Sequence, residues 1–272
     1  MSDIFDVRGK GIVITGGAGV LCGAMAEDLA AAGAKVSIAD FDLPRAQALA
    51  DKITASGGTA CAVRINVLDK AEVEQAYEAS LDALGNIDAL INGAGGNRKE
   101  ATTSPELSFF DLPPEALKSV FDLNFVGTLL PCQVFGKHFA AQKQGIILNV
   151  SSMNAFRPLT KICGYSAAKA AVSNFTEWLA VHLAHNCSTE IRVNAIAPGF
   201  FLTDQNRFLL TDEKTGALTP RGQTIIDHTP MGRFGEAEEL CGTVRWLLSD
   251  ASKFITGIVV PIDGGFNAFS GV

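Results

Sequence analysis

A tyrosine and a lysine stand four residues apart in the segment Tyr165-Ser-Ala-Ala-Lys169, which opens a stretch with helical spacing. On a helix this spacing puts both side chains on one face, one turn apart. A free tyrosine titrates at roughly pH 10, but a neighbouring ammonium stabilises the phenolate and lowers the pKa. We therefore expect Lys169 to lower the pKa of Tyr165, and Tyr165 to act as an acid/base. The same spacing also occurs by chance in helices whose lysine is solvated.

A glycine-rich turn near the N-terminus is a second candidate site. It runs Thr15-Gly-Gly-Ala-Gly-Val-Leu-Cys-Gly23, between an apolar segment at 11–15 and a helical pattern over about 19–32. Glycines let a backbone approach a pyrophosphate, and a helix N-terminus stabilises its charge. The turn therefore predicts a dinucleotide site, formed by Gly16, Gly17, Gly19, Val20 and Leu21.

Asp40 ends the next apolar segment, 24 residues after Gly16. A carboxylate at this position accepts hydrogen bonds from ribose hydroxyls and repels a 2′-phosphate. Since no Arg or Lys lies in the glycine turn or directly after Asp40, the sequence favours NAD over NADP. The alternative is that Asp40 only caps the next helix, although Asp42 is better placed to do so.

Alternating strand-like and helical segments must position these residues. The short apolar, β-branched segments are 11–15, 35–40, 60–65, 87–92, 145–151, 191–197 and 258–263. Because the apolar runs are continuous, we expect seven buried parallel strands with helices on both faces. This predicts an α/β fold, a Rossmann-type doubly wound sheet, as a single dinucleotide-binding and catalytic domain over 1–272. The weakly patterned segment at about 200–234 is either a lid over the site or a surface loop.

Composition excludes several other classes of protein. The 22 basic and 29 acidic residues give a formal net charge of -7, which argues against a nucleic-acid partner. Neither a membrane span nor a signal peptide is visible, so we expect no membrane partner and a cytoplasmic location. Six cysteines without a CxxC pair favour reduced, mostly buried thiols. His182 and His185 could suit a metal by spacing, but no carboxylate partner is evident and we expect no metal.

Further motifs complete a family pattern. They are Asn92-Gly93-Ala94-Gly95 after the fourth strand-like segment, Asn124 in LNFVGT, Ser152 at 13 residues before Tyr165, Pro198-Gly199 with Thr203, and Asp263-Gly264-Gly265. With these motifs the chain resembles a single-domain short-chain dehydrogenase/reductase over about residues 8–266. One departure is that Val20 and Cys22 stand where the common turn of that family has its second and third glycines. Gly19 is the expected substitute.

The resemblance implies an NAD-dependent oxidoreductase that moves a hydride between its cofactor and an alcohol or carbonyl carbon. It implies that Tyr165 transfers the proton, that Ser152 hydrogen-bonds the reacting oxygen, and that Lys169 also holds the nicotinamide ribose. Asn124 would anchor a proton-relay water. A homotetramer or homodimer is implied as well, packed through the helix that carries alanines 167, 168, 170 and 171.

Further cofactor contacts are implied in the same way. Asn66 and Val67 would flank the adenine, while Asn92, Gly93 and Ala94 would line the cofactor cleft. Near the nicotinamide, the implied contacts are Pro198, Gly199, Phe201 and Thr203.

The residues expected around the substrate are polar and partly cationic. An acidic polyol favours amide hydrogen bonds and pairing with a guanidinium, whereas steroid or fatty-acyl substrates favour apolar walls. We therefore expect a sugar acid, bound by Ser152, Asn154, Tyr165, Asn97 and Arg207. Arg98, Lys99 and Arg157 lie in the same segments, and such cations are also common on ordinary solvated surfaces.

The segments 92–97 and 197–210 resemble a subgroup described as D-mannonate oxidoreductases, which implies interconversion of D-mannonate and D-fructuronate with NAD(H). Several alternatives stay open. One is another sugar acid or polyol, such as gluconate/5-ketogluconate or tagaturonate, and another is a 3-oxoacyl substrate. A third is a protein that senses NAD without turnover, because a fold alone does not establish an activity.

Overall fold

Seven parallel strands form one sheet in the order β3-β2-β1-β4-β5-β6-β7. The computed structural model describes residues 3–203, 207–212 and 215–271. The strands are β1 (Gly11–Thr15), β2 (Lys35–Asp40), β3 (Thr59–Arg64), β4 (Ala89–Asn92), β5 (Gly145–Val150), β6 (Ile191–Pro198) and β7 (Val259–Ile262). The strand order reverses between β1 and β4, which is where a doubly wound sheet binds its ligand. The predicted fold class is therefore confirmed.

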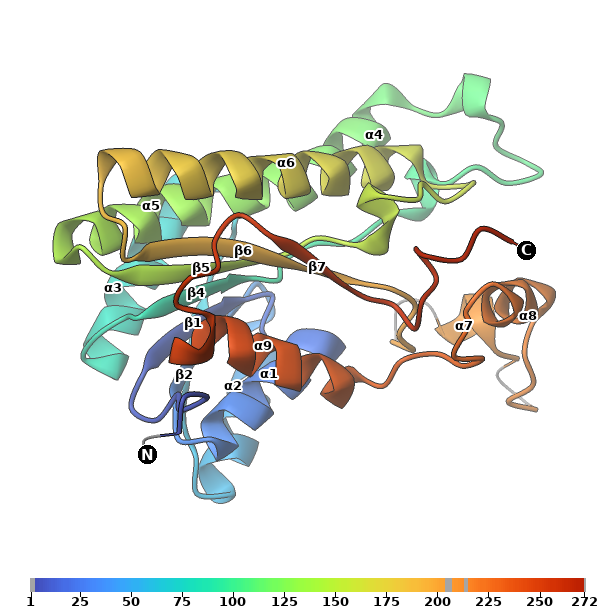
Figure 1. Ribbon diagram of the computed structural model, residues 1–272. Helices are drawn as coiled ribbons and strands as arrows, with labels where there is room; N and C mark the ends of the chain where they lie inside the picture. The colour runs from blue at the N-terminus through green and yellow to red at the C-terminus, as the bar shows by residue number, and fades with distance from the viewer. Residues whose placement is uncertain (1–2, 204–206, 213–214, 272) are drawn as a thin grey trace.

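Helices cover both faces of the sheet (Figure 1). One face carries α1, α2 and α9, and the other carries α3, α5 and α6, with α4 packed against α6. The helices are α1 (Val20–Ala31), α2 (Leu43–Ala55), α3 (Lys70–Leu84), α4 (Pro114–Phe121), α5 (Gly127–Gln142), α6 (Cys163–Asn186), α7 (Arg207–Leu210), α8 (Pro220–Asp227) and α9 (Cys241–Leu248). This two-sided cover explains why the inner strands read as continuous apolar runs.

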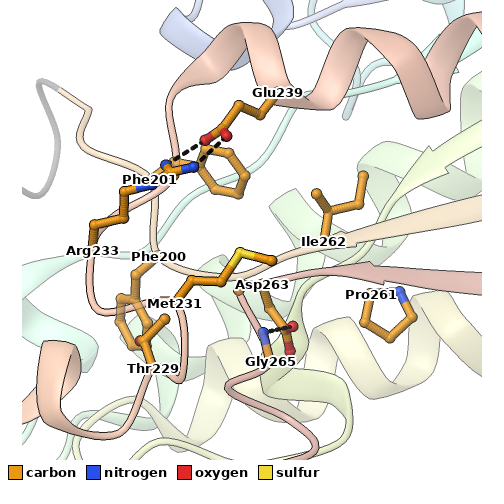
Figure 2. Close-up of a pocket in the computed structure, with 12 residues that line it drawn as sticks. Phe200, Phe201, Thr229, Met231, Arg233, Glu239, Pro261, Ile262, Asp263 and Gly265 are labelled. Carbon is orange, nitrogen blue, oxygen red and sulfur yellow. Dashed lines mark hydrogen bonds and ion pairs between the residues drawn. The ribbon is translucent and has the colours of Figure 1, made fainter.

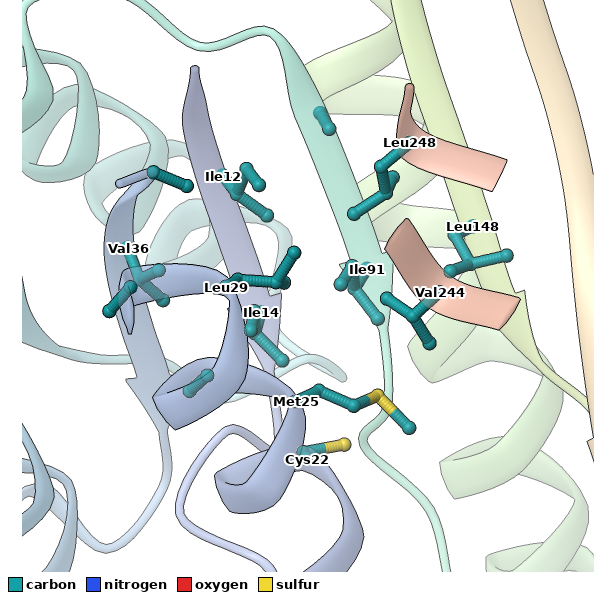
Figure 3. Packing of buried hydrophobic residues seen from close by; sticks show 14 of the residues in the cluster. Ile12, Ile14, Cys22, Met25, Leu29, Val36, Ile91, Leu148, Val244 and Leu248 are labelled. Atoms are coloured by element: carbon teal, nitrogen blue, oxygen red, sulfur yellow. The ribbon is translucent and has the colours of Figure 1, made fainter. Parts of the chain in front are cut away.

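The core beneath the glycine turn fixes where α1 begins. In Figure 3, Cys22, Met25 and Leu29 of α1 point onto the strands, next to Val244 of α9. All four side chains are buried, and burying an aliphatic side chain of this size contributes about 1.5–3 kcal/mol. The apolar face of α1 therefore holds the N-terminal end of the helix at the carboxyl end of β1.

The two outermost strands differ from the sequence-based expectation. β1, β4 and β6 are buried throughout, but β7 is only half-buried and β3 has exposed residues at both ends. The prediction that all seven strands are buried is therefore wrong for β3 and β7. The reason is their position at the sheet edges, which a pattern of apolar residues does not reveal.

The segment at about 200–234 is closed at its base. Phe201 and Gly235 form a parallel bridge, and the backbone N–H of Gly235 donates to the carbonyl of Phe200 at 2.9 Å. The segment contains α7 and α8, joined through an antiparallel bridge between Thr211 and Leu218. In Figure 1, α7 and α8 stand apart from the helices that cover the sheet. Within the expected lid, residues 204–206 and 213–214 lie outside the described residues.

Candidate active site

The glycine turn places backbone without side chains at the carboxyl ends of β1 and β4. Gly16 has φ +64°, and a Cβ at this position would lie 2.7 Å from the Cα of Ala94. A Cβ on Gly17 would lie 2.8 Å from the carbonyl oxygen of Ile14. Gly19 precedes α1, and no described side chain caps the helix there. Open N–H groups at a helix start suit an anion, so the turn fits the pyrophosphate of a dinucleotide.

The departure from the family turn is accommodated within α1. Val20 is the first residue of the helix, and Cys22 lies on its buried face. Burial raises the pKa of the Cys22 thiol to about 12. Cys22 therefore serves as a small packing residue beneath the turn, and Gly19, at the helix N-cap, is the glycine next to the helix start.

Asp40 links the end of β2 to the glycine turn. Its Oδ2 accepts a hydrogen bond from the backbone N–H of Ala18 at 3.0 Å, and its Oδ1 accepts one from Asp42 at 2.9 Å. The N-cap of α2 is Asp42, which accepts from the N–H of Arg45 at 3.1 Å. The interpretation of Asp40 as a helix cap is therefore wrong, and its carboxylate lies beside the turn as expected for a ribose ligand.

The loops after β3 and β4 carry the next predicted cofactor residues. The Oδ1 of Asn66 accepts from the N–H of Leu68 at 3.1 Å, whereas the side chain of Val67 is buried in the core. Asn92 is buried and donates through Nδ2 to Asn149 Oδ1 at 2.9 Å. Its Oδ1 has no partner among the described residues. Val67 can therefore contact a ligand only through its backbone. Asn92 keeps one side-chain acceptor, its Oδ1, for a ligand.

The four contacts predicted near the nicotinamide lie at the end of β6 and directly after it. A Cβ on Gly199 would lie 2.6 Å from the Cα of Asp263, so Pro198-Gly199 must stay next to the Asp263 turn. The ring of Phe201 is buried against Gly235, and Thr203 is half-buried. The ring of Phe201 packs in the core, so the contact with the nicotinamide that the sequence predicts would have to come from the backbone of Phe201.

Ser152, Tyr165 and Lys169 form one cluster at the start of α6. Ser152 is buried, its Oγ accepts from the N–H of Asn154 at 3.2 Å, and its hydroxyl acts to lower the pKa of the Tyr165 phenol. The ammonium of Lys169 lies 5.6 Å from the centre of the Tyr165 ring and donates to the carbonyl of Val150 at 2.8 Å. The predicted Tyr/Lys arrangement on one helix face is therefore present.

The pKa values in this cluster differ from expectation. Burial raises the pKa of Tyr165, and the neighbouring Ser152 hydroxyl, which lowers this pKa, offsets only part of that effect. Burial also lowers the pKa of Lys169 to about 8. The expectation that Lys169 lowers the pKa of Tyr165 is wrong for this structure, because Lys169 is itself desolvated and directs its ammonium to Val150.

Asn124 lies in a π-helical turn, Asp122–Val126, between α4 and α5. Its Nδ2 donates to the carbonyl of Gly96 at 2.7 Å, and its Oδ1 accepts from the N–H of Gly96 at 3.2 Å. A Cβ on Gly95 would lie 2.6 Å from Asn124 Oδ1 and 3.3 Å from Lys169 Nζ. Gly95 therefore lets Asn124 approach the cluster, a role that sequence reasoning did not assign despite its place in the NGAG motif. π-Helical turns such as the one that carries Asn124 occur frequently at functional sites.

The predicted substrate residues lie on separate elements. Asn154 is 6% exposed, and its Oδ1 has no partner among the described residues. Asn97 is exposed and donates to Thr102 Oγ1 at 2.8 Å, while Arg207 is exposed at the start of α7. The structure therefore places Asn154 next to Ser152, but it shows no contact of Asn97 or Arg207 with the cluster.

Two cationic loops are tied together beside the cluster. The N–H of Thr103 donates to the carbonyl of Lys161 at 3.0 Å. This bond joins the loop that carries Arg98 and Lys99 to the loop that carries Arg157. All of these cations are exposed and form no ion pair within the described residues. Cys163, the first residue of α6, follows the second loop and is exposed, unlike the mostly buried thiols that the sequence predicts.

A pocket of about 390 Å³ lies beside the carboxyl ends of β6 and β7 (Figure 2). Arg233 pairs with Glu239 through two hydrogen bonds of 2.7 and 2.6 Å. Figure 2 shows this pair beside the ring of Phe201, with Met231 and Ile262 further into the view. Because the two charges neutralise each other and most of the lining is apolar, this pocket does not suit an acidic sugar. Of the predicted site residues, only Phe201 lines it.

Comparisons with known proteins agree with this geometry. A family model described as enoyl-(acyl carrier protein) reductase matches residues 18–267. The uncharacterized oxidoreductase UxuB of Bacillus subtilis is 50% identical, with 98% of each chain covered. The 5-keto-D-gluconate 5-reductase of Escherichia coli is 34% identical, with 97% of this chain and 98% of the relative covered. This chain belongs to the short-chain dehydrogenase/reductase family.

Solved structures of the family agree in fold. A Haemophilus influenza protein with the provisional name D-mannonate oxidoreductase, solved with bound NAD, superposes with a TM-score of 0.92 at 45% identity and 98% coverage of both chains. A gluconate 5-dehydrogenase from Burkholderia cenocepacia, in complex with NADP and tartrate, gives a TM-score of 0.86 at 30% identity and 98% coverage of both. As a member of the short-chain dehydrogenase/reductase family, this protein is an oxidoreductase that uses a nicotinamide cofactor.

Two further features concern metals and membranes. Among the described residues, no group of three or more His, Cys, Asp and Glu side chains could hold a metal ion, and His182 instead stacks on Trp178 at 4.8 Å between ring centres. Within the same residues, none of the helices has the length and apolar character needed to cross a membrane. The cytoplasmic location expected from the sequence stays a prediction.

Proposed function

We propose that this protein is an NAD(H)-dependent reductase of sugar acids that interconverts D-fructuronate and D-mannonate. The observation that carries the proposal is Asn154, whose buried amide oxygen lies next to Ser152 without a hydrogen-bond donor. A buried acceptor without a donor costs about 1–3 kcal/mol, so a substrate hydroxyl that supplies the donor gains affinity there. Sugar acids carry hydroxyls on most of their carbons, whereas a steroid or fatty-acyl chain presents mainly apolar surface.

The two linked cationic loops support an acidic substrate. The chain has a net charge of -7, yet Arg98, Lys99 and Arg157 have no carboxylate partner within the described residues. An arginine can bind a carboxylate through two parallel hydrogen bonds. In the proposal, these loops and Arg207 attract the carboxylate, while Asn97 and Asn154 bind hydroxyl groups. The names of the Haemophilus and Escherichia coli relatives, a mannonate oxidoreductase and a ketogluconate reductase, favour the same class.

The proposed chemistry divides between cofactor and protein. Bound NAD(H) supplies or accepts the hydride. Ser152 and Tyr165 hydrogen-bond the reacting oxygen, and Tyr165 passes its proton to that oxygen during reduction. Lys169 holds the nicotinamide ribose, and Asn124 anchors the relay that returns a proton to Tyr165. Preorganised donors of this kind lower the barrier because negative charge develops on the substrate oxygen.

NAD is the proposed cofactor because Asp40 lies beside the glycine turn and would repel a 2′-phosphate. The NAD in the Haemophilus structure supports this choice. The other residues that we propose to hold NAD are Gly16, Gly17, Gly19, Val20, Leu21, Asn66, Val67, Asn92, Gly93, Ala94, Pro198, Gly199, Phe201 and Thr203. In this proposal, the whole chain is one dinucleotide-binding and catalytic domain, with 200–234 as its lid.

The test is a substrate panel with NADH. Purified protein is offered fructuronate, tagaturonate, 5-ketogluconate and neutral ketoses. We expect fructuronate to give the highest kcat/KM, and Arg157→Gln to raise its KM without changing the KM of a neutral ketose. Lys137→Gln, an exposed lysine on α5, serves as the matched control. Equal turnover of fructuronate and neutral ketoses contradicts the sugar-acid proposal, and preference for 5-ketogluconate shifts it to that acid.

We also propose a homotetramer or homodimer that packs through α6. Trp178 and Val181 are each 57% exposed on this helix, and Phe175 stacks on Trp178. Ala168 is buried, whereas Ala167 and Ala170 are exposed. Light scattering of Trp178→Glu is expected to give a smaller assembly than the wild type. An unchanged mass for this variant contradicts packing through α6.

A further inference from the structure

The sheet register places an arginine beside Asp40. β2 and β3 pair in parallel with Asp40 opposite Arg64. Side chains opposite each other on neighbouring strands point to the same face of a sheet. Asp40 and Arg64 therefore leave the sheet on one side, at the carboxyl ends of both strands. The absence of a basic residue directly after Asp40 in the sequence does not exclude a cation at this place.

Two neighbours hold the guanidinium of Arg64. Its Nη1 donates to Oε2 of Glu72, in the first turn of α3, at 2.9 Å. Its central carbon lies 4.1 Å from the centre of the Phe41 ring, and Phe41 directly follows Asp40. Within the described residues, the ion-pair partner of Arg64 is Glu72 and not Asp40. The cation–π contact with Phe41 and the ion pair with Glu72 thus hold the guanidinium of Arg64, so that it forms no ion pair with the carboxylate of Asp40.

The Arg64–Glu72 pair can exchange partners at low cost. The side chains of Arg64 and Glu72 are 41% and 34% exposed, and ion pairs at such exposure contribute at most about 1 kcal/mol. A phosphate carries up to about two negative charges and accepts two parallel hydrogen bonds from a guanidinium. A 2′-phosphate at the end of β2 would therefore compete with Glu72 for Arg64 if Asp40 did not repel it.

We propose that Arg64 is a latent ligand for the 2′-phosphate of NADP and that Glu72, together with Phe41, withholds it and so helps to select NAD. The inference rests on the NAD preference of the proposed function. Selection of NAD then has two parts. Asp40 repels the extra phosphate, and Glu72 neutralises the cation that could attract it. Specificity of this kind depends on an element that disfavours the wrong ligand.

The test measures cofactor binding without substrate, by titration of NADPH and NADH fluorescence. Asp40→Asn removes the repelling charge and is expected to admit NADPH weakly. Adding Glu72→Gln to Asp40→Asn is expected to tighten NADPH binding by about tenfold more, because Arg64 is freed for a charge-assisted hydrogen bond. The affinity for NADH should not change with this second substitution. Glu74→Gln, an exposed acid two residues further along α3, is the matched control in the same background.

Two outcomes overturn the proposal. NADPH affinity that does not rise when Glu72→Gln is added shows that Arg64 is not withheld. A rise that persists when Arg64→Gln is added as a third substitution shows a general charge effect and not an arginine ligand. Thermal unfolding of each variant confirms that it is folded. If the wild type binds NADPH as tightly as NADH, the NAD preference itself fails, and the comparison between the Asp40→Asn variants still reports on Arg64.

Discussion

The thiol of Cys22 occupies the space in which a side chain on Gly93 would lie. A Cβ built on Gly93 would overlap the Sγ of Cys22 and would lie 2.9 Å from the carbonyl oxygen of Thr15. Cys22 belongs to α1 and Gly93 directly follows β4, so this contact joins the two backbone segments that border the cofactor cleft. Cys22, which stands where the family has a glycine, therefore requires a glycine at position 93 in the neighbouring loop.

Gly93→Ala is expected to destabilise the protein by about 1–3 kcal/mol, the usual cost of forcing extra atoms into a packed interior. It should also weaken NADH binding, because the loop after β4 must move. In the double variant Cys22→Ala/Gly93→Ala the nearest atom of residue 22 is its Cβ, at 3.7 Å, which is an ordinary contact. Urea unfolding should therefore show that Cys22→Ala restores part of the loss. Strictly additive effects of the two substitutions contradict the contact.

Tyr165→Phe is expected to lower kcat by about 10²–10⁴, because general acid–base catalysis contributes that much. The substitution removes only the phenol oxygen, and the half-buried ring stays in place, so NADH binding should persist. Steady-state kinetics and a fluorescence titration of NADH check both parts. Turnover within tenfold of the wild type would instead favour the alternative of a protein that senses NAD without catalysis.

Lys169→Met is expected to stabilise the protein at pH 7 while abolishing turnover. The pKa of Lys169 falls from 10.5 to about 8 through burial, which corresponds to a cost of about 3 kcal/mol for keeping the buried ammonium charged. This is an upper limit for the gain, since methionine leaves the carbonyl of Val150 without the donor it has now.

The stability difference between Lys169→Met and the wild type has a defined pH window. Below pH 8 both folded and unfolded Lys169 are protonated, so the full cost is present. Between about pH 8 and 10.5 the folded side chain loses its proton while the unfolded one retains it, and the wild type gains stability as the pH rises. Urea unfolding at pH 7 and pH 10 should show the difference shrinking. A difference independent of pH contradicts a buried charge, and Lys137→Met is the control at an exposed site.

Asn154→Leu is expected to keep or raise the free energy of unfolding, by up to about 1 kcal/mol, because it removes a buried oxygen that has no donor. The KM of the sugar acid should rise about tenfold, which corresponds to one lost neutral hydrogen bond. Asn154→Asp keeps an acceptor but adds a negative charge, so it should raise the KM of an acid more than that of a neutral ketose. A KM unchanged by Asn154→Leu removes Asn154 from the substrate site.

The sequence by itself determined the elements and the identity of the reactive cluster. Tyr165 and Lys169 are one helical turn apart, and Gly16 and Asp40 lie within one strand–helix–strand unit, so their spacing follows from the period of local structure. Strand ends were predictable to within two residues for the same reason, because inner strands of a covered parallel sheet are marked by their own apolar residues.

Only the tertiary structure decided the properties that depend on distant parts of the chain. Desolvation raises the pKa of Tyr165 and lowers that of Lys169, and it arises from packing that no local pattern describes. The pairing register of β2 and β3 brings Arg64 beside Asp40, and the crossing of α1 over the end of β4 fits Cys22 to Gly93. These contacts join residues that are far apart in sequence, so their identity becomes visible only when the sheet is assembled.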